Sequence, residues 1–411
     1  MEDNKSFRNN LIVLTIMFGI VRISIFTSYH LVSPFMPEIA RNLNTTLIVI
    51  GLIISIRSAM GFLGTVWGSV TDLTGPKRGV LIGLTVFGVS MLVIYLFPAL
   101  GIFAVALPVS YAAILTFDAA MYSYLSDKIP YKNRGKMVAV LESSYALAFM
   151  LGSPIAGVLM SRYSWNTPFL FMGLIAAVFI IIIALILPKD RKRERAANGA
   201  EPKEKYSAQL LKVVKDKPAI LAIVTCTLMM GGNWFAQNMY GAWLEDYYGQ
   251  SIEQIGFISS AFGLAVFAGA MLCLIFTDKL GKTKAMAVGV TVTIAAGIGA
   301  AVFNANSLII GSVFLFLYFC FIEFATESAI ALMTEVREDI RATVVATSFG
   351  ALAVGSTVGC GLSPIVYEKG YTPCIIIGTV ILLAALFIIL KVLHPHFSKS
   401  GEEERGTGAA S

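Results

Sequence analysis

Six charged residues stand inside long apolar stretches of this sequence, where a charge is costly and is rarely kept without a role. Carboxylates in such surroundings can take up and release a proton, and a guanidinium group can hold an anion. At a helical rise of ~1.5 Å per residue, each lies between ~12 and ~22 Å from the predicted cytoplasmic edge of a membrane. The six residues are Arg22, Arg57, Asp118, Glu142, Glu323 and Glu327.

Glu323 and Glu327 are spaced by four residues and therefore share one face of a helix. Two neighbouring anions in a low dielectric repel each other, so we expect this pair to hold a proton near neutral pH. The hypothesis is that the pair, together with Asp118 or Glu142, couples a transport process to protons. The alternative is structural: Arg22 and Arg57 neutralise two of the acids, and the others form local hydrogen bonds.

A second set of polar side chains recurs at helical spacing. Asn233, Gln237 and Tyr240 follow the i, i+4, i+7 pattern of one helix face, and Arg22 and Tyr29 have the same i, i+7 relation. We expect both faces to line one central cavity. Hydrogen bonding between packed helices is the competing interpretation for each residue taken singly.

The elements that position these residues are membrane-spanning helices. The chain has 411 residues, of which 57% are hydrophobic and 14% charged, well below the charge content of a soluble protein. Its apolar stretches are long enough to cross a bilayer as helices, and the short alternating segments of an outer-membrane barrel are not present. We predict an all-α integral membrane fold with spans at 10–32, 46–70, 79–97, 102–126, 136–161, 167–188, 218–245, 252–277, 284–304, 308–333, 342–368 and 372–394.

The distribution of basic residues predicts the orientation. Of the 31 lysines and arginines, only Arg41, Arg162 and Lys369 fall on the predicted outer side, and Arg22 and Arg57 lie within spans. This asymmetry favours a plasma (cytoplasmic) membrane protein with both termini in the cytoplasm. The net charge of +6 is then mainly an orientation signal, and we expect no nucleic-acid partner and no cleaved signal peptide.

Two similar halves flank a charged linker. Asp72 and Gly75 recur as Asp278 and Gly281, 206 residues later, and Arg134 recurs as Arg341. This internal duplication predicts two six-helix bundles, the parallel repeat found in many secondary transporters. The predicted domains are bundles at 1–188 and 218–394, a cytoplasmic linker at 189–217 with a short amphipathic helix near its end, and a disordered tail at 395–411.

The turn after the second predicted span carries a family resemblance. The stretch GSVTDLTGPKRG is similar to the signature loop of the major facilitator superfamily, and IFTDKLGKTKAM resembles its weaker second copy. The stretch LGSPIAG resembles the fifth-span Gly-Pro motif of exporters, although its order differs from the usual one. The resemblance implies two pseudo-symmetric six-helix bundles and a cytoplasmic gate. The predicted gate residues are Gly68, Asp72, Gly75, Lys77, Arg78, Arg134, Asp278, Gly281, Lys282 and Arg341.

The expected function is secondary active transport of a small molecule by alternating access, with no enzymatic activity and no cofactor. Proton-coupled efflux of a lipophilic or amphipathic compound fits the excess of buried acids, and transport of an organic anion held by the buried arginines is the alternative. Five scattered cysteines show no metal-ligand spacing and indicate packing residues, so we expect no metal site. The expected partners are the substrate, protons and the bilayer, and we expect a monomer.

Overall fold

The computed structural model describes residues 2–64, 74–126, 129, 131–187 and 206–397. Within these ranges, eleven helices are long and apolar enough to cross a membrane, and one bent pair of helices makes a twelfth candidate. The prediction of an all-α membrane fold is confirmed. Exposed side chains on these helices are large and apolar, among them Val105, Leu185 and Ile309, as expected for surfaces that face lipid.

The described chain forms two compact units. The first comprises residues 1–199 and 240–264, and the second comprises residues 200–239 and 265–411. The segment 240–264 thus belongs to the first unit, although it was predicted to lie in the second bundle. The division into two six-helix bundles stays a prediction. Residues 189–205 of the predicted linker and 398–411 of the predicted tail lie outside the described residues.

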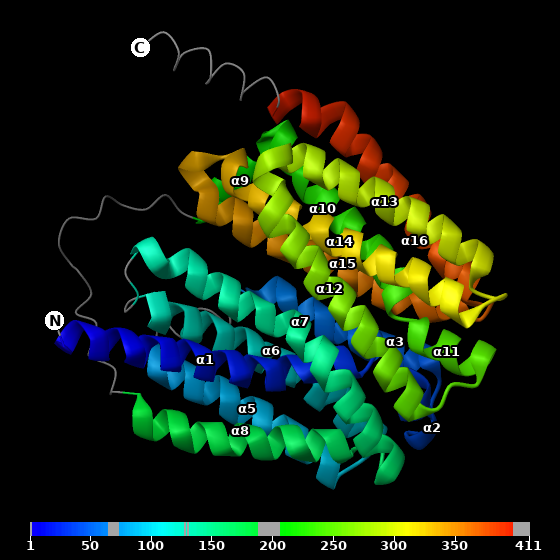
Figure 1. Cartoon of the computed structure of the whole chain (residues 1–411), viewed down its shortest axis with the longest axis horizontal. Coiled ribbons are helices and arrows are strands. Elements are labelled where there is room, and N and C mark those ends of the chain that lie inside the picture. Colours follow the sequence, from blue (N-terminus) through cyan, green and yellow to red (C-terminus); the bar gives the residue numbers. More distant parts are fainter. Residues whose placement is uncertain (1, 65–73, 127–128, 130, 188–205, 398–411) are drawn as a thin grey trace. The chain divides into compact units, whose positions relative to one another are not determined.

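The first unit is built around long helices that lie side by side (Figure 1). Helix α1 packs against α7 and α8, and α5 packs against α6 and α8, while α3 lies against α6. The helices are α1 (Glu2–Leu31), α2 (Met36–Asn42), α3 (Leu47–Ala59), α5 (Pro76–Leu96), α6 (Leu100–Ser126), α7 (Tyr131–Arg162), α8 (Thr167–Ile186), α11 (Tyr240–Tyr248) and the first part of α12 (Ile252–Leu280).

The predicted span at 46–70 differs from a single straight helix. Thr46 caps α3 by accepting a hydrogen bond from the backbone N–H of Val49, and α3 ends at Ala59. A 3-10 turn, Met60–Leu63, follows, and residues 65–73 lie outside the described part. Helix α2 precedes α3 at an angle of 112°, so this pair is the bent candidate span.

The second unit repeats the same packing with other helices. Helix α10 packs against α15 and α16, and α13 packs against α14 and α16, as α1 and α5 do with their partners in the first unit. This correspondence supports the internal duplication inferred from the sequence. The elements are α9 (Tyr206–Lys215), α10 (Lys217–Gln237), the rest of α12, α13 (Lys282–Phe303), α14 (Leu308–Val336), η2 (Glu338–Ile340), α15 (Arg341–Tyr367), α16 (Tyr371–Ile388) and η3 (Ile389–Leu393).

Gly75 and Gly281 hold equivalent places in the two units. Gly75 has φ +93° and precedes α5, and Gly281 has φ +84° and precedes α13. A side chain at either position would strain the backbone, because only glycine adopts these angles at low cost. The glycine predicted in each copy of the turn therefore sets the direction in which the next helix leaves the turn.

Candidate functional site

Arg22 of α1 lies between two carboxylates inside the first unit. Its Nε and Nη2 donate to the two carboxylate oxygens of Asp118 on α6, at 3.1 Å each. Its Nη1 donates to the backbone carbonyl of Leu141 and lies 3.5 Å from Oε1 of Glu142, both on α7. The Arg22 side chain is 3% exposed and that of Asp118 is 18% exposed, whereas Glu142 is half-exposed. The guanidinium of Arg22 therefore pairs with two carboxylates, and Asp118 is more deeply buried than Glu142.

Tyr122 completes this cluster and was not identified from the sequence. Its hydroxyl donates to Oε1 of Glu142, and its ring lies 5.6 Å from the guanidinium carbon of Arg22. Phe26 covers the same guanidinium at 5.0 Å. Tyr122 is four residues after Asp118 on α6, and that helical spacing is the signal that could have found it.

Arg57 of α3 has a different environment, although its side chain is only 1% exposed. Its Nη1 donates to the backbone carbonyl of Tyr29 at 2.9 Å, and its guanidinium carbon lies 4.3 Å from the centre of the Tyr29 ring. The Nε and Nη2 atoms are buried and have no hydrogen-bond partner. No ion pair is formed by Arg57 with any described carboxylate. The sequence hypothesis that both arginines neutralise acids therefore fits Arg22 and not Arg57.

An aromatic cluster surrounds this part of the first unit. The ring of Tyr29 lies 5.4 Å from that of Tyr111 on α6 and 6.1 Å from that of Tyr145 on α7. His30 stacks on Phe149 with ring centres 4.6 Å apart, and its buried Nε2 has no hydrogen-bond partner. Of these rings only Tyr29 was predicted from the sequence to line a cavity, because aromatic residues in apolar spans usually serve packing.

Glu323 and Glu327 lie on α14 in the second unit, both half-buried. Helix α12 comes close to Glu323 at Gly269, where an added Cβ would lie 2.8 Å from Cβ of Glu323. Glu327 lies within electrostatic range of Cys273, also on α12. The two acids therefore lie on the side of α14 that faces α12, and their role in proton coupling stays a prediction.

The polar face predicted at Asn233, Gln237 and Tyr240 is divided. Nδ2 of Asn233 donates to Oε1 of Gln237 at 2.8 Å within α10, so these two share a face. Helix α10 ends at Gln237, however, and Tyr240 begins α11 in the first unit, where its hydroxyl donates to Ser259. Residues 217–248 nevertheless form one candidate membrane span, so a face shared by all three residues stays a prediction. The break is held by Nδ2 of Asn238, which donates to Oγ of Ser363 at 3.0 Å.

Two predicted gate residues, Lys77 and Lys282, form contacts at the starts of α5 and α13. Nζ of Lys77 donates to the carbonyl of Ala184 at 2.8 Å and to that of Leu187, at the end of α8. Lys282 forms an ion pair with Glu335, near the end of α14. Both lysines thereby link the start of one helix to the end of another within the same unit.

The remaining predicted gate residues are exposed or lie outside the residues that the structure describes. Arg78, Asp278 and Arg341 are exposed. Gly68 and Asp72 lie outside the described residues, as does the side chain of Arg134. A gating role for these positions stays a prediction.

Within the second unit, a contact network joins the turn after α9 to the segment between α14 and α15. Nη1 of Arg337 donates to Asp216 at 3.0 Å, and its other nitrogens donate to both oxygens of Asp339 at 2.8 Å. These bonds lower the pKa of the Asp339 carboxyl to about 2. Asp216 also caps α10 by accepting from the backbone N–H of Ala219. The helix predicted near the end of the linker is present as α9, and this network fixes the turn between α9 and α10.

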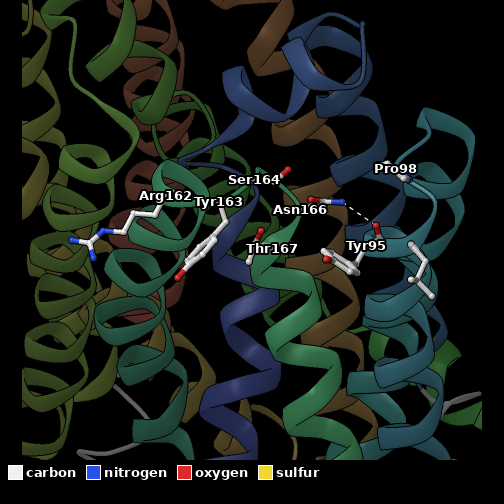
Figure 2. Close-up of a pocket in the computed structure, with 8 residues that line it drawn as sticks. Tyr95, Pro98, Arg162, Tyr163, Ser164, Asn166 and Thr167 are labelled. Carbon is white, nitrogen blue, oxygen red and sulfur yellow. Dashed lines mark hydrogen bonds between the residues drawn. The ribbon is translucent and has the colours of Figure 1, made fainter.

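Two hollows on the first unit are lined by described residues, and neither of these two contains a residue predicted to line the central cavity. One, of about 710 Å³, lies where α7 meets α8; Figure 2 shows Arg162 and Tyr163 on one side and Tyr95 and Pro98 on the other. Nδ2 of Asn166 donates to the Tyr95 carbonyl across it, at 2.9 Å. The other, of about 230 Å³, is an apolar groove between α1, α7 and α8 that includes Gly152 of the LGSPIAG stretch.

The sequence profile of the Major Facilitator Superfamily matches residues 18–247 and 223–410. The chain is 25% identical over 393 residues to the uncharacterized MFS-type transporter YceJ of Bacillus subtilis (strain 168), covering 94% of this chain and 97% of that protein. It is 23% identical to the probable galactarate/D-glucarate transporter GarP of Escherichia coli (strain K12), covering 68% and 69% of the two chains. It is 21% identical to multidrug resistance protein 2 of Bacillus subtilis (strain 168), covering 63% and 65%.

A solved structure has a similar fold. The crystal structure of a bacterial homologue of the human lysosomal transporter Spinster, in an inward-facing and unoccupied conformation, superposes with a TM-score of 0.75. The sequences are 13% identical, and the match covers 93% of this chain and 96% of that one. At this identity the likeness concerns the fold alone.

Proposed function

Since the chain belongs to the Major Facilitator Superfamily and is a transporter of small molecules, we propose that it couples transport to protons through Arg22, Asp118 and Glu142. The observation that carries this proposal is the sharing of one buried guanidinium between two carboxylates of unequal exposure. In this proposal the triad can adopt two arrangements, and a proton selects between them.

The two arrangements differ in which acid pairs with Arg22. With Asp118 charged, Arg22 keeps its two-point contact with that carboxylate. A proton on Asp118 removes this contact and leaves Glu142, now 3.5 Å from Nη1, as the remaining counter-ion. The guanidinium then moves toward α7, so proton binding changes how α1 is tied to α6 and α7. In this proposal that change biases the carrier between its two access states.

The proposed location is the plasma membrane, with both termini in the cytoplasm. This orientation follows from the distribution of lysines and arginines along the sequence. Glu323 and Glu327 of α14 are proposed as a second proton-responsive pair, because two acids at i and i+4 repel each other when both are charged. The contacts of Lys77 and Lys282 are proposed to belong to the cytoplasmic gate.

Two classes of cargo are candidates. Efflux of a lipophilic or amphipathic compound in exchange for protons is supported by the excess of carboxylates over arginines in the spans and by the similarity to multidrug resistance protein 2. Transport of a small organic anion is supported by the buried guanidinium of Arg57 and by the similarity to GarP, whose name refers to two sugar acids.

Proton coupling is tested by reconstituting the protein in liposomes that contain a pH-sensitive dye. Substrate candidates are added under an imposed proton gradient, and the lumenal pH is followed. Asp118→Asn is expected to abolish substrate-dependent proton movement, because an amide side chain does not take up a proton near neutral pH.

Glu368→Gln serves as the matched control, since Glu368 is an exposed acid in the loop before α16. It should retain wild-type proton movement. Substrate flux in Asp118→Asn that is still driven by the proton gradient would contradict the proposal.

A further inference from the structure

Arg22 and Arg57 use the same part of the guanidinium for the same kind of contact. In each, Nη1 donates to a backbone carbonyl, that of Leu141 for Arg22 and that of Tyr29 for Arg57. The two arginines differ on the other side of the guanidinium, which carries Nε and Nη2. We call these two donors the fork. The fork of Arg22 holds both oxygens of Asp118, whereas the fork of Arg57 is buried and unpartnered.

The unpartnered fork is an energetic anomaly. Nη1 of Arg57 keeps one hydrogen bond, but Nε and Nη2 lose their hydration on burial without a counter-ion or a hydrogen bond in return, which is unfavourable. The ring of Tyr29, 4.3 Å away, offsets a part of this through a cation–π contact. Structural stability alone would favour a neutral side chain here, so the charge points to a bound partner.

Nε–H and Nη2–H of a guanidinium are parallel donors, and their spacing matches the two oxygens of a carboxylate. The first unit already contains this pairing at Arg22 and Asp118. We propose that the fork of Arg57 is a subsite for the carboxylate group of the transported substrate. This inference rests on the proposed transport function and names the chemical class of its cargo, an organic carboxylate.

The surroundings of the fork favour an organic anion over a small inorganic one. Tyr29, Tyr111 and Tyr145 form linked ring contacts at 5.4 and 6.1 Å, next to the ring of His30. Both Tyr111 and His30 lie within electrostatic range of Arg57. A flat or short carbon skeleton attached to the carboxylate can pack against these rings, as ligands do in apolar pockets with few polar groups.

The subsite lies two helical turns from the proposed coupling triad. Tyr29 is seven residues after Arg22 on α1, and Tyr111 is seven residues before Asp118 on α6, so each pair shares a helix face. Seven residues correspond to a rise of ~10 Å. A carboxylate at Arg57 and a proton at Asp118 would thus occupy separate layers of the same helices, close enough to influence each other electrostatically.

Binding to the purified, detergent-solubilised protein tests the subsite. The probes are formate, benzoate and succinate, with benzamide and succinamide as uncharged counterparts and inorganic phosphate as a tetrahedral anion. At least one carboxylate is expected to bind and to raise the melting temperature, while its amide does not. Arg57→Gln should weaken that binding at least ~30-fold, because it removes both fork donors and the charge.

Two further variants separate the outcomes. Arg57→Lys keeps the charge without the fork and should bind with intermediate affinity. Arg162→Gln, an exposed arginine at the end of α7, should bind as the wild type does. Without ligand, Arg57→Gln should melt at a higher temperature than the wild type, because an uncompensated buried charge is gone.

Carboxylate binding that is unchanged in Arg57→Gln would overturn the inference. So would a wild-type protein that binds phosphate, or one that binds none of the carboxylate probes. Asp118→Asn distinguishes this inference from the proposed coupling. The subsite predicts that Asp118→Asn still binds the carboxylate, whether or not proton movement is lost.

Discussion

Arg22 and Asp118 form a two-point ion pair between α1 and α6, with 3.1 Å at each contact. Removing one partner leaves the other charged and buried. Arg22→Gln is therefore expected to cost about 3–5 kcal/mol of stability, the range for breaking a buried pair. Thermal unfolding in detergent measures the loss as a fall in melting temperature.

The double variant Arg22→Met, Asp118→Leu provides the comparison. Since it removes both buried charges and leaves only the half-exposed Glu142 without its cation, most of the stability should return although transport is lost. Single and double variants that melt at the same temperature would show that the pair is not buried as described.

Tyr122→Phe tests the hydrogen bond to Glu142. The Tyr122 hydroxyl donates to Oε1 of Glu142, and its ring lies beside the guanidinium of Arg22. Without the hydroxyl the Glu142 carboxylate loses a hydrogen bond to a charged group, worth about 1.5–3 kcal/mol, so proton-driven substrate flux is expected to fall at least ~10-fold.

The measurement is substrate flux in liposomes between pH 5 and 9. Tyr163→Phe is the matched control, because the Tyr163 side chain is 74% exposed. A Tyr122→Phe profile that overlays the wild-type profile would remove Glu142 from the coupling triad.

Gly281→Ala tests the positive φ of the turn before α13. Nothing lies within 4 Å of an added Cβ at this position, so any loss of stability comes from the backbone angle of +84°. The expected cost is about 1–3 kcal/mol. Gly350→Ala, also in open space but within α15, should instead be neutral or stabilising, since alanine favours a helix. Equal melting temperatures for the two variants would contradict the strain at Gly281.

The Arg337 network should not depend on pH in the physiological range. Asp339 has a folded-state pKa of about 2, below its ordinary value of 3.8, so its stabilising contribution is complete above about pH 4 and is lost as pH falls toward 2. The difference in melting temperature between Arg337→Gln and wild type should thus be constant from pH 5 to pH 8. A difference that changes within this range would mean that another group titrates in the network.

Much of the fold follows from the sequence because a bilayer imposes simple rules. A run of about twenty apolar residues must be helical, and glycines at 75 and 281 mark turns that no other residue tolerates well. The pairing of charges does not follow, since Arg22 and Asp118 are 96 positions apart and only the packing of α1 on α6 brings them together.

The unpartnered fork of Arg57 is also invisible in the sequence, because it is defined by what the neighbouring helices do not supply. The break between α10 and α11 was missed for a similar reason. The residues at the break, Asn238 and Met239, carry no proline or glycine signal, and the side chain of Asn238 instead satisfies backbone and hydroxyl groups of α15.

The membership of α12 in both compact units has a mechanical consequence. The chain passes from the second unit to the first at the break between α10 and α11, and it returns at Leu264–Ala265, in the middle of a continuous helix. A break can act as a hinge at little cost, whereas a helix must bend or lose hydrogen bonds to do so. As a continuous helix that belongs to both compact units, α12 therefore resists local bending more than the two-residue break between α10 and α11 does.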